Sequence, residues 1–173
     1  TPGAANAGGS LDFVEDVVIS HEPGFYDEPF AVELSCATPG ALIRFTTNGS
    51  APSLETGITY TGPLLVDDTT ALRVGAFRED FEPSYIDTRS YLFLDTPAGG
   101  GILHQESRPP GYPNSWGGLT ADYEMDQRVV SQENSAHYDE RVRDALLAMP
   151  SLSIVMDIDD LFHPATGIYS NSL

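Results

Sequence analysis

Residues 42–50 read Leu-Ile-Arg-Phe-Thr-Thr-Asn-Gly-Ser, a short run of strand-forming residues that ends in an Asn-Gly pair. Asn and Gly tolerate a positive φ, so the chain can reverse its direction at residues 48–49 at low cost. We therefore expect a strand over residues 41–46, followed by a turn.

Similar short strands flank this one on both sides. Apolar and polar residues alternate cleanly in Ala31-Val32-Glu33-Leu34 and in Leu72-Arg73-Val74, which indicates strands with one buried and one wet face. Pairs such as Pro23-Gly24 and Gly62-Pro63 mark the turns between them, at spacings typical of sandwich folds. The pattern predicts an open antiparallel β-sandwich with strands at residues 17–20, 30–35, 41–46, 70–77 and 87–94.

The character of the chain changes after Asp95. Residues 97–101, Pro-Ala-Gly-Gly-Gly, resemble a linker, and a Pro/Gly-rich stretch follows them. Helical spacing predicts a helix over 137–149, capped by Ser135 and ended by Pro150. We expect a strand over 151–156 and a turn with a short helix over 157–162. The expected division is a leader at 1–16, a sandwich at 17–95 and a mixed α/β extension at 96–173.

The composition excludes some partners. The 173 residues carry 26 acidic side chains against eight basic ones, all arginine, for a formal charge of −18. Such a polyanion repels nucleic acid, which normally requires a basic patch. No apolar run approaches the roughly 20 residues of a membrane-spanning helix. With 40% hydrophobic residues, however, the chain can bury a core.

Several blocks of the first half resemble the chitobiase/β-hexosaminidase C-terminal-type domain. They are Ile19 to Tyr26, Phe30 to Leu34, Ile43 to Pro52, Tyr60 to Pro63 and Leu72 to Phe77. The resemblance covers about residues 17–94 and implies a small Ig/fibronectin-III-like β-sandwich. It departs from the family at Asn48, where the family's turn usually has Asp. The resemblance also implies a module that accompanies glycosidases without supplying their catalytic acids.

The second half is similar to the segment that leads into a CotH-type (spore-coat kinase-like) domain in large secreted bacterial proteins. The similarity rests chiefly on Ile154-Val155-Met156-Asp157, Asp160-Leu161-Phe162 and Gly167-Ile168-Tyr169. The chain stops before the part of that domain that holds nucleotide and metal. No kinase residue is therefore carried over.

Asp157, Asp159 and Asp160 form a compact acidic group after the expected strand. Oxygen-rich groups of this kind bind Ca²⁺, although this one lacks the glycine and the distal Glu of an EF-hand loop. The alternative is that Asp160 caps the short helix. No cofactor other than this calcium ion is expected.

Tyr112, Trp116 and Tyr123 fall in the Pro/Gly-rich stretch. Flat rings in loops stack on sugars or anchor protein interfaces. The alternative, which we favour, is that these rings pack the extension onto the sandwich.

The sequence contains no G-x-S-x-G elbow, H-E-x-x-H pair or phosphate-binding glycine loop. We therefore expect no enzymatic activity. The expected function is that of an extracytoplasmic bacterial accessory module, periplasmic, cell-surface or secreted, that docks onto or orients a larger protein assembly. Two alternatives stay open: a carbohydrate-binding module, and the N-terminal fragment of a CotH-like kinase-family surface protein.

Overall fold

The computed structural model describes residues 12–116, 118–126, 128 and 138–170, with the backbone alone for Trp116 and residues 138–140. Ser135 and most of the expected leader lie outside these residues. Within them the chain is mainly β, as the sequence predicts.

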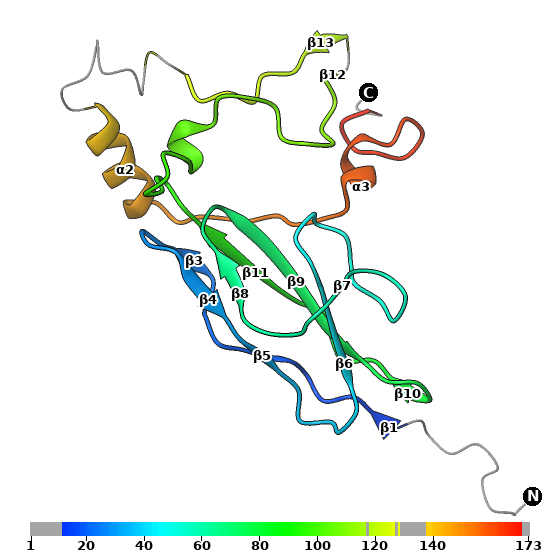
Figure 1. Cartoon of the computed structure of the whole chain (residues 1–173). Coiled ribbons are helices and arrows are strands. Elements are labelled where there is room, and N and C mark those ends of the chain that lie inside the picture. The colour runs from blue at the N-terminus through cyan, green and yellow to red at the C-terminus, as the bar shows by residue number, and fades with distance from the viewer. Residues whose placement is uncertain (1–11, 117, 127, 129–137, 171–173) are drawn as a thin grey trace, which may run out of the picture.

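A five-stranded sheet forms one layer of the sandwich (Figure 1). Its order is β3 (Gly24–Phe25), β11 (Asp87–Leu92), β9 (Thr70–Phe77), β6 (Leu42–Thr46) and β7 (Ile58–Thr59). All neighbours are antiparallel except β11 and β3, which run parallel. The predicted strand at 70–77 is confirmed at both ends, and the strands at 41–46 and 87–94 are confirmed with slightly shorter bounds.

Two short antiparallel pairs supply the opposing layer. β2 (Val18–Ile19) pairs with β5 (Leu34–Ser35), and β4 (Phe30–Val32) pairs with β8 (Leu64–Val66). The expected strand at 30–35 is thus interrupted at Glu33. A further parallel pair, β1 (Asp12–Phe13) with β10 (Phe81–Glu82), closes one end. β1 lies inside the range that we assigned to the leader, so part of that range belongs to the sandwich.

The core lies between these layers. Val32 and Leu34 from the short pairs belong to one buried cluster with Leu72, Val74 and Tyr91 of the large sheet. Leu72 and Val74 are buried on the face that the alternation predicts, and Arg73 between them is partly exposed. The Asn48-Gly49 turn also forms, with Gly49 at φ +85° and the Asn48 side-chain oxygen accepting the Ser50 amide hydrogen.

Beyond the sandwich the described elements are short. They are a 3₁₀ turn (Ile102–His104), the hairpin β12 (Ser115–Trp116) with β13 (Leu119–Thr120), α2 (Tyr138–Ala148) and α3 (Ile158–Phe162). The two predicted helices are confirmed where the structure describes them. The 3₁₀ turn folds back onto the sandwich, because Ile102 and Leu103 donate backbone hydrogen bonds to Phe93 and Leu94.

The predicted strand at 151–156 is wrong. The segment has no ladder partner among the described residues and crosses the sandwich as irregular chain, where the Ser153 hydroxyl meets that of Ser90 on β11. β11 pairs with β9 along residues 87–91 and with β3 at Tyr91 and Leu92, and residues 151–156 do not join its ladder on either side. The alternation of Leu152, Ile154 and Met156 therefore has no sheet to join.

Candidate functional site

The extension brings two of its predicted aromatic residues together. The rings of Tyr112 and Tyr123 meet edge to face with their centroids 5.6 Å apart. Tyr112 also contacts Phe162 of α3 at 5.4 Å, and Phe162 stacks on Tyr169 at 5.5 Å. The group joins the loop, α3 and the segment after it. The side chain of Trp116 lies outside the described residues.

A surface hollow of about 740 Å³ lies beside this ring group, and Tyr123 is part of its wall. The other wall residues are mostly polar and include Arg108, Asn114, Asp122 and Glu124. The Tyr123 hydroxyl donates to the Pro113 carbonyl at 2.9 Å, and desolvation raises the pKa of this phenol. A cation, an amide and carboxylates around an aromatic ring can hydrogen-bond a polar ligand.

The three predicted calcium ligands lie at the start of α3. The Asp157 carboxylate accepts the backbone hydrogen of Asp159 at 3.0 Å, so Asp157 is the N-cap of this short helix. Asp159 and Asp160 occupy the first turn. Within the described part of the chain, no three His, Cys, Asp or Glu side chains are grouped so that they could hold a metal ion. The calcium site stays a prediction.

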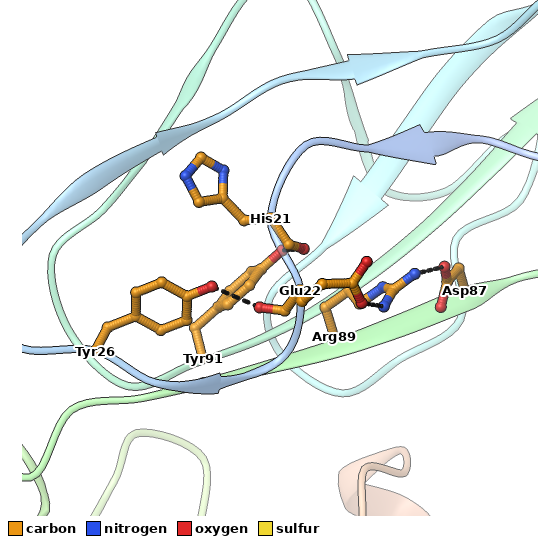
Figure 2. A network of polar contacts seen from close by, with 6 residues as sticks. All are labelled: His21, Glu22, Tyr26, Asp87, Arg89 and Tyr91. Carbon is orange, nitrogen blue, oxygen red and sulfur yellow. Dashed lines mark hydrogen bonds and ion pairs between the residues drawn. The ribbon is translucent and has the colours of Figure 1, made fainter.

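A polar network that sequence reasoning missed lies at the β3 edge of the large sheet (Figure 2). Arg89 on β11 bridges two carboxylates, Glu22 at 2.7 Å and Asp87 at 2.9 Å. Asp87, Arg89 and Tyr91 alternate along β11 and so share one face. The turn that leads into β3 contributes Glu22, and the network therefore ties this turn to the sheet.

Two phenols complete the network (Figure 2). Tyr26 donates to the Glu22 carbonyl at 2.6 Å, and Tyr91 donates to the His21 carbonyl at 3.1 Å. The rings of His21, Tyr26 and Phe30 stack beside Tyr91, with 4.2 Å between the centroids of Tyr26 and Phe30. The rings hold the backbone of residues 21–26 against β11.

The electrostatics of this network favour a structural role. Burial alone would lower the pKa of Arg89, but the charges and hydrogen bonds of Asp87 and Glu22 raise it instead. Burial also raises the pKa of Tyr91 to about 12. Arg89 therefore stays charged and Tyr91 neutral at any physiological pH. Neither is poised to exchange a proton, as a general acid or base must be.

The comparison with family models finds one match. Residues 21–88 match the model of the chitobiase/beta-hexosaminidase C-terminal domain, an accessory and non-catalytic domain of those glycosidases. The matched segment includes Glu22, Tyr26 and Asp87 of the network, but Arg89 and Tyr91 lie just beyond it. The similarity to a CotH-type segment receives no support from any comparison. No curated protein and no solved structure matches the chain.

Proposed function

We propose that the chain is a non-catalytic accessory module of an extracytoplasmic bacterial protein, in which residues 17–95 are a rigid sandwich and residues 96–173 dock onto a neighbouring protein surface. The match to an accessory glycosidase domain supports the first half of this proposal. No described helix is long and apolar enough to cross a membrane.

The distribution of apolar side chains supports the second half of the proposal, docking through residues 96–173. Among the described residues, every fully buried apolar side chain except that of Leu103 belongs to residues 14–94. The extension thus has almost no core of its own. Its described aromatic side chains contact one another in a small group, and several of its aliphatic side chains stay exposed to water.

The longest exposed apolar stretch runs from the end of α2 into the irregular segment. Leu152 is 86% exposed and Ile154 is 70% exposed, and Leu147 and Met149 precede them on the same stretch. Figure 1 shows this segment, in orange, along one end of the sandwich. Burying one such side chain against a partner contributes about 1.5–3 kcal/mol, so a few of them can drive association.

The sandwich supports docking because its surface is already ordered. Its strands are hydrogen-bonded in register, so the body that carries the docking extension needs no further ordering when a partner binds. The Arg89 network fixes the turn at 21–26 in the same way. A rigid body of this kind can hold a neighbouring domain in one orientation.

Site-specific photo-crosslinking in the producing cell tests the proposal. A photoreactive phenylalanine analogue at Ile154 should form a defined crosslinked product with another polypeptide. The matched control is the same residue at Leu65 on β8, which is exposed to a similar extent but lies on the sandwich. A yield at position 154 that does not exceed the yield at position 65 would reject docking through the extension.

A second candidate function, carbohydrate binding, is favoured by the hollow beside Tyr123. Its wall combines a ring with charged and amide side chains, the groups that fix sugars. Affinity electrophoresis in polysaccharide gels separates the two functions. Retardation that is lost in Tyr123→Ala would support sugar binding, whereas equal mobility with and without polysaccharide would exclude it for the polymers used.

A further inference from the structure

An open hollow of about 420 Å³ is lined by residues of β1 and β10 and of the segments that follow them. Figure 1 shows β1 and β10 at the end of the sandwich away from the extension. The walls of the hollow come from β1 with the residues after it and from the turn after β10. Two hydrogen bonds join these walls, one between backbone groups and one from a backbone amide to a carboxylate. Val14 donates to the Glu82 carbonyl at 2.9 Å, and the Tyr85 amide donates to the Asp16 carboxylate at 3.0 Å. The hollow therefore has a defined shape without a ligand.

Two aromatic rings of this hollow contact water. Phe13 is 72% exposed and Tyr85 is 83% exposed, although other rings of the sandwich, such as those of Tyr91 and Phe93, are completely buried. One ring belongs to β1 and the other to the turn after β10, so each wall carries one of them. The negative face of an aromatic ring attracts a cation that approaches within about 6 Å.

All charged side chains in the wall of the hollow are negative. Glu15, Asp16 and Glu82 contribute carboxylates, and no basic side chain lines the hollow. In the described part of the chain, the carboxylates of Glu15 and Glu82 form no hydrogen bond or ion pair. Arg78 lies in the neighbouring turn but is already engaged, because its guanidinium covers the Phe81 ring and donates to the Pro39 carbonyl.

We infer that this hollow binds a basic side chain, the guanidinium or ammonium group of an arginine or lysine on a protein partner. The rings supply cation–π attraction and the carboxylates supply hydrogen-bond acceptors for the N–H groups. The net charge of −18 adds long-range attraction for such a partner. An anionic ligand would meet repulsion from all three carboxylates. The inference names a surface that is separate from the extension, so the two proposals fail independently.

A peptide titration of the full chain tests the inference. The probe is an acetylated Gly-Arg-Gly-Arg peptide, and the control is its citrulline counterpart, which has the same shape without the charge. Binding followed by amide NMR shifts should perturb residues 13–16 and 82–85. We expect the arginine peptide to bind at least about fivefold more tightly, from combined cation–π and charge contacts at an exposed site. Equal affinity for the two peptides would overturn the inference.

Matched variants separate a local site from general attraction to an acidic protein. Glu82→Gln and Glu55→Gln remove the same charge, but Glu55 lies in an exposed loop outside the hollow. Only Glu82→Gln should weaken binding, by about two- to fivefold. Tyr85→Ala should weaken it similarly, whereas Tyr85→Phe, which keeps a ring, should retain most of it. Equal effects of Glu82→Gln and Glu55→Gln, or no effect of Tyr85→Ala, would contradict a site here.

Discussion

At the scale of single residues, Tyr91 shows how the fold uses a neutral phenol. The ring is completely buried, and its hydroxyl donates to the His21 carbonyl. Because ionisation would place an uncompensated charge in the core, burial raises the pKa of Tyr91 to about 12. The folded state thus favours the protonated phenol more strongly than the unfolded chain does.

The stability that depends on this proton should be lost at alkaline pH. A raised pKa in the folded state contributes stability that is complete below about pH 10 and declines as the pH approaches about 12. We expect the free energy of unfolding to fall by about 2 kcal/mol from this group between about pH 8 and pH 12. Urea unfolding at several pH values measures the decline.

Tyr91→Phe is the control for this prediction. It keeps the ring but removes the titrating group and its hydrogen bond, so it should cost about 1 kcal/mol near neutral pH. Between about pH 8 and pH 12 its stability should decline less than that of the parent chain. If both proteins lost the same free energy over this range, Tyr91 would not be responsible for the decline.

At the scale of elements, local patterns predicted the long strands well. Residues 70–77 alternate and form β9, because each inward side chain meets the opposing layer. The same kind of pattern failed at residues 151–156, which form no ladder with any strand of the described residues. A strand depends on a partner elsewhere in the chain, which local sequence does not specify.

Local sequence is similarly limited as a guide to the candidate sites, because it predicts contacts between near neighbours but not between distant residues. The acidic group does cap the short helix, but the expectation that Asp160 is the cap is wrong: Asp157 is the N-cap and Asp160 lies in the first turn. The contact between Tyr112 and Tyr123 and the bridge from Glu22 to Arg89 join residues that a linear pattern does not relate. Such contacts follow from strand register, and only the structure provides it.

The irregular segment at 151–156 packs against the Asn48-Gly49 turn. A Cβ added at Gly49 would overlap the Met156 carbonyl, and the φ of +85° already disfavours a side chain. Gly40 has a similar φ of +74° but open space around it. Both Gly→Ala substitutions should cost about 1 kcal/mol for the backbone, and Gly49→Ala about 1–3 kcal/mol more for the overlap.

Urea unfolding of the two glycine variants measures this difference. A larger loss in Gly49→Ala would confirm that residues 151–156 rest against the turn. Equal losses in the two variants would show that moving residues 151–156 away from the turn costs no stability. That result would contradict the contact between this segment and the Asn48-Gly49 turn.

At the scale of the whole molecule, burial is divided unevenly. The sandwich contains the core, and among the described residues the extension adds only Leu103 to the fully buried apolar side chains. The net charge of −18 opposes close contact between two copies of the chain, which agrees with our proposal that the exposed apolar stretch binds a different protein. The central claim is that this stretch serves association and contributes little to the fold of the chain itself.

The free energy of unfolding of the Leu152→Ser/Ile154→Ser double variant tests this claim most directly. Both side chains are largely exposed, so the isolated protein should lose no more than about 0.5 kcal/mol. Leu72→Ser, in the core of β9, is the positive control and should cost about 4 kcal/mol or more. A loss of about 2 kcal/mol or more in the double variant would contradict the claim, because it would show that these side chains support the fold of the chain itself.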